Sequence, residues 1–158
     1  MSVKTHPDVG VFLEEVEFRD AALLSFVTSA IIVPAYDEIH ASYGIIRAEY
    51  LLLLCCSHFD ALTAQDVSEL TGRPRNSISR AVSRMVDVGY IEKTPDPSDG
   101  RQSILRITEK GYQLHKQVAT LMQGEQENVL GALTDSERGT LVKLLRKIAL
   151  GKVASVCG

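Results

Sequence analysis

The sequence of 158 residues has little cysteine and lacks the short motifs of several common enzyme classes. Its three cysteines are Cys55, Cys56 and Cys157; the two neighbours cannot easily pair with each other, so we expect no disulfide framework and a reducing cytoplasm. The four histidines are scattered and form no His-x-x-x-His pair, which argues against a metal enzyme. Neither the Gly-x-Ser-x-Gly elbow of hydrolases nor a phosphate-loop spacing is present. We therefore predict no enzymatic activity, no metal and no cofactor.

Targeting and membrane signals are also missing from the sequence. The first ten residues are neither basic nor continuously apolar, so no signal peptide is expected. The most apolar stretch, residues 21–36, is interrupted by polar residues and Pro34 and falls short of the roughly 20 residues that a bilayer span needs. It predicts a buried helix over residues 19–42, with a kink or break near residues 30–34 at the proline. Because this helix is apolar nearly all round, a partner chain is needed to cover it.

Charge is weak overall but unevenly distributed. The composition, 45% hydrophobic and 23% charged, is that of an ordinary globular chain. The formal net charge is −3, which argues against indiscriminate coating of nucleic acid. Residues 73–110 nevertheless hold eight Lys or Arg against five acidic residues, while the remainder holds nine against fifteen. A basic segment on an acidic body is typical of a selective nucleic-acid binder.

Residues 62–89 read as two short helices joined by a turn. Thr63 is the expected N-cap of the first helix, which places Ala64, Val67 and Leu70 on one face, and Gly72 ends it. Pro74 suits the first turn of the second helix, which runs to about residue 88 and stops at Gly89. That helix buries residues at 3–4 residue spacing: Ile78, Val82 and Met85. Its other face carries short polar side chains and arginines: Arg75, Asn76, Ser77, Ser79, Arg80, Ser83 and Arg84.

A charged hairpin is predicted directly after this pair of helices. Residues 91–94 and 102–107 are rich in β-branched side chains and predict two short strands. The loop between them contains two prolines and an Asp-Gly pair. Its tip presents Arg101 as a minor-groove probe or a phosphate clamp, with Asp99 expected to orient the guanidinium through a bidentate pair. The alternative is an ordinary hairpin with incidental charges.

The order of these features resembles the winged helix-turn-helix of the MarR (multiple-antibiotic-resistance regulator) family of transcription factors. The residues that carry the resemblance are 76–82 (NSISRAV), 89–93 (GYIEK), 96–101 (DPSDGR) and 105–111 (LRITEKG). The last two contain the most specific part, an Asp two residues before an Arg, then a strand and an Ile-Thr-x-x-Gly helix start. The resemblance implies a mainly α fold with a β-hairpin wing and N- and C-terminal dimerisation helices.

The resemblance and the helical patterns together give the expected domain organisation. Residues 1–44 and 108–152 supply dimerisation helices, residues 45–107 the DNA-binding lobe and residues 153–158 a loose tail. Thr108 is expected to cap a helix that ends near residue 130, and residues 134–137 (TDSE) form a capping box for the last helix. Residues 1–12 are expected to be loose. Both terminal regions are too apolar for one chain and predict a homodimer.

The expected function is sequence-specific binding of double-stranded DNA by a cytoplasmic regulator, most simply a repressor. A two-fold dimer would place its recognition helices about 34 Å apart on an inverted-repeat operator. Base reading is assigned to Arg75, Asn76, Ser77, Ser79 and Arg80, phosphate contacts to Arg84 and Lys93, and the wing tip to Asp99 and Arg101. A winged helix used only for protein contacts is the alternative; it would tolerate loss of Arg80 and Arg101.

Two inputs could control such a regulator. The family resemblance implies a small aromatic or phenolic ligand, for which Tyr36, His40, Tyr43 and Arg47 combine aromatic surfaces with a cation. Each of these also has an ordinary structural interpretation as a buried tyrosine or a paired arginine. The rival input is thiol oxidation at Cys55 or Cys56, although their place at the end of an apolar helix also suits small core residues.

Overall fold

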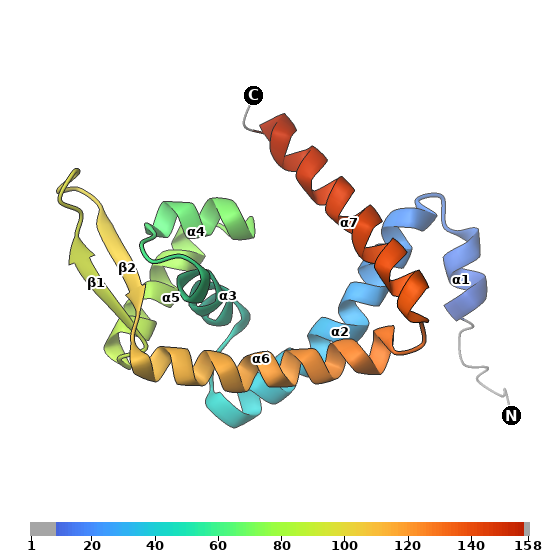
Figure 1. Cartoon of the computed structure of the whole chain (residues 1–158), viewed down its shortest axis with the longest axis horizontal. Helices are drawn as coiled ribbons and strands as arrows, with labels where there is room; N and C mark the ends of the chain where they lie inside the picture. Colours follow the sequence, from blue (N-terminus) through green and yellow to red (C-terminus); the bar gives the residue numbers. More distant parts are fainter. Residues whose placement is uncertain (1–8, 157–158) are drawn as a thin grey trace, which may run out of the picture. The chain divides into compact units, whose positions relative to one another are not determined.

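The computed structural model describes residues 9–156, with only the backbone described for residues 152–156. This range forms seven helices and one two-stranded antiparallel sheet (Figure 1). It divides into two compact units, which we call the central unit (residues 32–123) and the terminal unit (described residues 9–31 and 124–156). The predicted mainly helical fold with a small hairpin is confirmed.

Two long helices contribute residues to both units. Helix α2 (Arg19–Tyr43) ends in the central unit, and helix α6 (Glu109–Leu130) begins there. The reason is packing, because Ile39 of α2 and Leu114 and Val118 of α6 are buried in the core of the central unit. This unit is therefore larger than the lobe of residues 45–107 that the sequence suggested.

The core of the central unit is built from α3 (Arg47–His58), α4 (Ala64–Thr71), α5 (Arg75–Asp87) and the hairpin strands β1 (Ile91–Pro95) and β2 (Ser103–Ile107). Each element contributes at least one side chain that is almost completely buried. The largest of these are Leu52, Leu53, Val67, Ile78, Met85, Ile91 and Leu105. Burial of each such side chain contributes about 1.5–3 kcal/mol, so these elements hold one another in place.

Local signals set the ends of α4 and α5 as predicted. The Thr63 hydroxyl accepts the Asp66 N–H at 3.2 Å, and the Asp66 carboxylate accepts the Thr63 N–H at 2.7 Å, which satisfies two donors at the start of α4. Gly72 ends α4 with φ of +65°, a left-handed conformation that favours glycine. Of the three residues predicted to share one face of α4, Val67 is fully buried, Ala64 is partly buried and Leu70 is 56% exposed.

Backbone hydrogen bonds hold the two strands of the hairpin together and join the hairpin to the residues just before α4. Strands β1 and β2 pair from Ile91 opposite Ile107 to Pro95 opposite Ser103. Leu105 of β2 also pairs with Leu62, the residue two before α4, through N–O distances of 2.7 and 3.4 Å. In Figure 1 the hairpin lies at one side of the α3–α5 cluster. These contacts fix the base of the wing next to α4 and α5.

The Ile-Thr-x-x-Gly segment that begins α6 has a packing explanation. The Thr108 hydroxyl accepts the Gly111 N–H at 3.1 Å and lies 2.8 Å from the carbonyl of Gly89, to which it donates. A Cβ atom at Gly111 would lie only 2.1 Å from the carbonyl oxygen of Tyr90. Only glycine lets the first turn of α6 approach the chain between α5 and β1 this closely.

The terminal unit contains α1 (Val9–Glu15), the first part of α2, the end of α6 and α7 (Asp135–Val156). The predicted capping box opens α7, where the Glu137 carboxylate accepts the Thr134 N–H at 2.8 Å. Residues 9–12 are helical rather than loose, and α7 continues past the predicted start of the tail at residue 153. The other residues expected to be loose, 1–8 and 157–158, lie outside the described range.

Helix α2 differs from the prediction in two ways. It is continuous through Pro34, so the expected break does not occur. It is also mostly exposed within this chain, where Leu24, Phe26 and Val33 are 46–55% accessible, so the expected buried helix needs a cover from outside the chain. By length and composition alone α2 is apolar enough to cross a membrane. Its C-terminal part instead packs into the protein core, where Ala35 and Ile39 are fully buried.

The close approach at Gly111 predicts a position-specific loss of stability. Gly111→Ala is expected to lower the free energy of unfolding by about 1–3 kcal/mol, because the added methyl group meets backbone rather than a movable side chain. Gly124→Ala is the matched control in the same helix, where the space is open. That change should raise stability by up to about 1 kcal/mol. Urea unfolding of the two variants tests this, and equal stability would contradict it.

Candidate nucleic-acid interface

Helix α5 presents a polar face to solvent because its opposite, apolar face is buried in the core. Ile78, Ala81, Val82 and Met85 are 0–5% exposed, which determines the side of the helix that faces the core. Five of the predicted reading or phosphate-contacting residues of α5 are consequently exposed: Arg75, Asn76, Ser79, Arg80 and Arg84. Ser77 is partly buried. The face thus offers hydrogen-bonding groups of the kind that pair with base edges.

A groove lies between this helix and the wing. Three of its lining residues are cations, Arg75 from α5 and Lys93 and Arg101 from the hairpin. The remaining polar residues that line it come from the start of α4, from α5 and from β2 and its approach: Thr63, Gln65, Ser79, Ser83, Gln102 and Ser103. Converging positive charge with hydroxyl and amide groups is suited to an anionic polymer such as a phosphate backbone.

The structure divides the predicted DNA-binding residues into two groups. Arg75, Ser79, Lys93 and Arg101 line the groove together although they are up to 26 positions apart. Asn76 and Arg80, which are exposed on α5, do not line it. They remain available to a ligand that approaches the helix from outside the groove.

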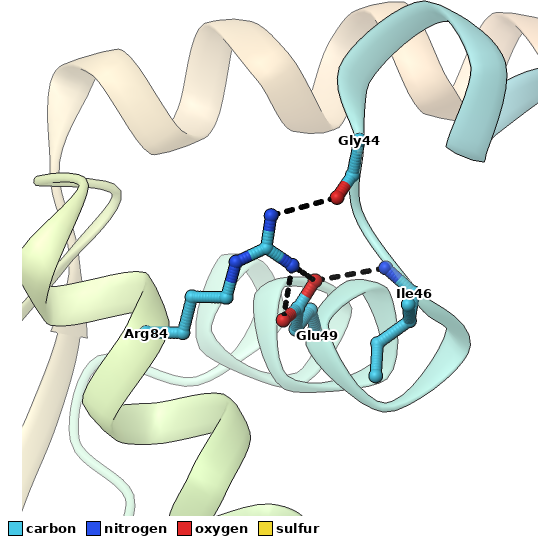
Figure 2. Close-up of polar contacts among 4 residues, drawn as sticks. All are labelled: Gly44, Ile46, Glu49 and Arg84. Carbon is cyan, nitrogen blue, oxygen red and sulfur yellow. Dashed lines mark hydrogen bonds and ion pairs between the residues drawn. The ribbon is translucent and has the colours of Figure 1, made fainter.

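Arg84 has a different role from the predicted phosphate contact. Its Nη1 atom donates to both carboxylate oxygens of Glu49 at 2.6 and 2.7 Å, and its Nη2 atom donates to the carbonyl of Gly44 at 2.8 Å (Figure 2). Glu49 is only 3% exposed, so its charge needs a partner inside the protein. The guanidinium is therefore directed at the protein, and we remove Arg84 from the phosphate contacts.

Asp99 also acts differently from the prediction. It forms no ion pair with Arg101; the two ion pairs of the described residues are Arg84–Glu49 and Arg138–Glu127. One carboxylate oxygen of Asp99 instead accepts the backbone N–H of Arg101 at 3.0 Å, and the other accepts the side-chain amide of Gln102 at 3.1 Å. Asp99 thus shapes the backbone of the wing tip and leaves the Arg101 guanidinium directed by the turn alone.

A second carboxylate orders the same tip. Asp96 accepts the backbone N–H of Ser98 at 2.8 Å and its hydroxyl at 2.7 Å. These two hydrogen bonds hold the pKa of Asp96 below its usual value. Both acidic residues of the wing loop are thus engaged in local turns.

Several groove residues were not predicted. Thr63 was interpreted only as a helix cap, Gln65 was not considered, and Gln102 was counted as a strand residue. Gln65 could have been found, because it is an exposed polar residue in the first turn of the helix expected to cross the phosphates. Ser83 was placed on the polar face of its helix but was assigned no contact. Ser103 carries no such signal, since its place in the groove depends on how the hairpin packs beside α5.

Of the four residues suggested for a small ligand, the structure brings two together. The guanidinium of Arg47 lies 5.6 Å from the centre of the Tyr36 ring, and the Tyr36 ring meets Tyr50 edge-on at 6.1 Å. Burial raises the pKa of Tyr36, and the charges of Arg47 and Arg73 act in the opposite direction. His40 is exposed, and Tyr43 packs against the core. The candidate ligand contacts are therefore reduced to Tyr36 and Arg47.

The cysteines of α3 are poorly suited to redox sensing. Burial raises the pKa of the Cys56 thiol to about 12, with a smaller contribution from Cys55, and burial also raises the pKa of Cys55. A thiol with such a pKa holds almost no thiolate, the reactive form, near neutral pH. Cys157 lies outside the described residues. Within the described part of the chain, no group of three His, Cys, Asp or Glu residues could hold a metal ion.

Comparison with known proteins bears on the family. Residues 43–102 match the model of the MarR family. The regulator BilQ of Clostridium symbiosum is 30% identical over 79 residues, which cover 50% of this chain and 55% of BilQ. The multiple antibiotic resistance protein MarR of Escherichia coli is 25% identical over 113 residues, which cover 71% of this chain and 78% of MarR. The matched region thus spans just over half of BilQ.

Solved structures show the same fold. A mutant of E. coli MarR complexed with operator DNA superposes with a TM-score of 0.72 at 22% identity, over 90% of this chain and 99% of that chain. The PcaV regulator of Streptomyces coelicolor in complex with its natural ligand gives a TM-score of 0.67 at 24% identity, over 92% and 96%. The segment that matches the family model contains α3, α4, α5 and β1; of the elements that line the groove, β2 lies beyond it. Residues 43–102 thus match the MarR family, and the chain has the fold of solved MarR structures.

Proposed function

We propose that the protein is a homodimeric, sequence-specific DNA-binding transcriptional regulator of the cytoplasm. The observation that carries the proposal is the groove between α5 and the wing, where Arg75, Lys93 and Arg101 converge beside the exposed polar face of α5. Support comes from E. coli MarR, a protein of the same fold whose structure was solved with operator DNA. Repression by blocking RNA polymerase at the operator is the simplest outcome of such binding.

Each part of the interface has a distinct contact with DNA in this proposal. Helix α5 enters the major groove, where Arg75 and Arg80 pair with guanine and Asn76 with adenine, while Ser77 and Ser79 hydrogen-bond to either. Lys93 contacts phosphate. Arg101 at the wing tip enters the minor groove or clamps a phosphate.

The apolar surface of the terminal unit supports the dimer. Large side chains of α1, of the turn before α2, of α2 and of α7 are exposed in the single chain, at 46–65%: Phe12, Phe18, Leu24, Phe26, Leu144, Ile148 and Leu150. Exposed apolar residues in such number on one unit mark an interaction site. Two copies related by a two-fold axis would cover this surface and read an inverted repeat with half-sites about 34 Å apart.

Removal of the wing arginine tests the DNA interface. Arg101→Ala is expected to weaken binding to the promoter of the protein's own gene and to lower the slope of log affinity against log salt by about 0.9 for each lost phosphate contact. Fluorescence polarisation from low to moderate salt measures both. Lys116→Ala is the matched control, since it removes one positive charge at a residue that does not line the groove.

The same assay separates the proposal from its alternative. A winged helix that contacts only proteins would bind the promoter and a random duplex equally weakly, and loss of Arg80 or Arg101 would change nothing. A wild-type protein that prefers the promoter, together with an unchanged slope for Arg101→Ala, would contradict the role of the wing but not DNA binding itself.

A charge in the apolar surface tests the dimer. Ile148→Glu in α7 is expected to reduce the mass in solution from twice 17.3 kDa toward that of one chain, because a carboxylate cannot be buried in an apolar interface at neutral pH. Lys147→Glu is the neighbouring control at an already charged, exposed position. Light scattering in detergent-free buffer gives the mass. A wild-type monomer at micromolar concentration, or a protein that requires detergent, would refute the dimer.

A small aromatic carboxylate is the ligand that the Tyr36–Arg47 pair favours. Arg47 offers a cation to a carboxylate, and the Tyr36 ring offers an aromatic face beside it, 5.6 Å from the guanidinium. One neighbour of the same fold supports this ligand class, because DNA binding by BpsR of Bordetella bronchiseptica is regulated by 6-hydroxynicotinic acid. Another neighbour, PcaV, was solved with its natural ligand. Release from DNA would follow if the ligand favours a different placement of α5.

Loss of the Arg47 cation tests this ligand class. Titration calorimetry with 6-hydroxynicotinate and hydroxybenzoates should show binding by the wild type and affinity reduced on the order of tenfold or more in Arg47→Gln, the loss of one charge-assisted hydrogen bond. His40→Gln, one helical turn from Tyr36 on the exposed side of α2, should bind as the wild type does. Equal affinity of all three proteins would exclude the pair as the ligand site.

A further inference from the structure

Arg84 joins the helix that carries the reading face to the end of another helix. Its Nη1 atom holds Glu49 in the first turn of α3, while its Nη2 atom holds the carbonyl of Gly44, which directly follows α2 (Figure 2). Glu49 in turn accepts the backbone N–H of Ile46 at 2.8 Å. One side chain of α5 thus fixes both ends of the three-residue linker between α2 and α3.

The chemistry of this contact is specific to arginine. The guanidinium is planar and presents several N–H groups in a fixed fork, so it can hold the carboxylate and the carbonyl at the same time. Lysine places one compact charge on a flexible chain and cannot fix both acceptors in one geometry. The linker is equally constrained, because Gly44 has φ of +64°, a conformation that other residues rarely adopt.

The position of Arg84 on α5 connects this contact to the reading face. Arg80 and Ser79 lie four and five residues before it, about one helical turn away. The core contacts of α5 are apolar and allow small rotations, whereas the three hydrogen bonds of Arg84 have defined directions. The rotation and the tilt of the reading face therefore depend on where the linker after α2 holds the guanidinium.

We infer that Arg84 is a positioning residue for DNA recognition, which sets the orientation of α5 from the end of α2 without touching DNA. The inference rests on the proposed function. Helix α2 also carries exposed apolar residues assigned above to the dimer interface, among them Leu24 and Phe26. A displacement of the end of α2 would thus reach the reading face through Gly44, Arg84 and α5.

Three variants test the inference on one DNA probe. The probe is a duplex that the wild-type protein selects from a random library, compared with a scrambled duplex of the same composition. Arg84→Lys keeps the charge but loses the fork. Arg84→Met leaves Glu49 buried without its partner, and the double variant Glu49→Gln with Arg84→Met removes both charges and so avoids an unpaired buried carboxylate.

The expected result distinguishes a positioning role for Arg84 from a purely stabilising role and from a contact with phosphate. Arg84→Lys and the double variant should lose on the order of tenfold in preference for the selected duplex, while affinity for the scrambled duplex and the salt slope stay at the wild-type values. Urea unfolding should show that the double variant is more stable than Arg84→Met. Arg101→Ala, measured in parallel, should lower the slope.

Three outcomes would overturn the inference. Wild-type preference in Arg84→Lys or in the double variant would reduce Arg84 to a stabilising residue. A salt slope lowered by about 0.9 for each chain of the dimer in Arg84→Met would show that Arg84 contacts a phosphate after all. A wild-type protein that selects no duplex from the library would refute the proposed function, and this inference with it.

Discussion

The orientation of α5 is the constraint on which the rest of the central unit depends. One stripe of this helix, Ile78, Ala81, Val82 and Met85, is buried almost completely, and the burial of such side chains is the largest stabilising contribution available to a short helix. The polar face is exposed as a direct consequence. Apolar packing alone does not define a rotation sharply, since it has no preferred direction. Glu49 adds that direction, because a carboxylate that is 3% exposed must meet the Arg84 guanidinium in a narrow range of geometries.

The terminal unit differs from the central unit because it exposes more apolar surface than its own helices can cover. Its helices are well formed, with a capping box at Thr134 and an ion pair between Glu127 and Arg138 that holds the pKa of Glu127 at about 2. Yet α7 has no fully buried residue among those whose side chains are described. Helices of this kind gain little from one another within one chain. In the proposed dimer a second copy would cover this surface, and this is why the dimer and the DNA interface belong to one proposal.

Sequence patterns predicted the features whose causes are local. The caps at Thr63 and Thr108, the stops at Gly72 and Gly89 and the hairpin strands all follow from residues within a few positions of one another, and the structure confirms them. Pro34 was expected to break α2 because it removes a hydrogen bond, but the helix continues on both sides of it. The free-energy cost of the one missing backbone hydrogen bond depends on what the rest of the helix contacts, which the sequence does not show.

The misassigned roles depend on contacts between distant residues. Arg84 looked like its neighbours on a polar helix face, and nothing in the sequence shows that Glu49, 35 positions earlier, is buried beneath it. Asp99 does contact Arg101, but its carboxylate accepts the backbone N–H of Arg101 rather than the guanidinium. Sequence reasoning therefore named the three cations that line the groove, Arg75, Lys93 and Arg101, but it predicted neither the groove itself nor which charged side chains are directed inward.

The corrected roles change how selectivity must arise. Four cations of the basic segment are exposed and remain assigned to DNA: Arg75, Arg80, Lys93 and Arg101. Arg84 is matched by Glu49, and Lys110 donates to the carbonyl of Val88 at 2.7 Å. Arg75 and Arg80 are assigned to base edges, which leaves Lys93 and Arg101 for phosphates. A dimer with these two phosphate contacts per chain would give a salt slope of at most about 3.6, and the acidic remainder of the chain opposes non-specific attraction. With so limited an electrostatic contribution, discrimination between sequences has to come from the fit of α5 to base edges. That fit depends on the rotation of α5 about its axis. Recognition therefore depends on the packing and the hydrogen bonds that hold α5 from within the protein.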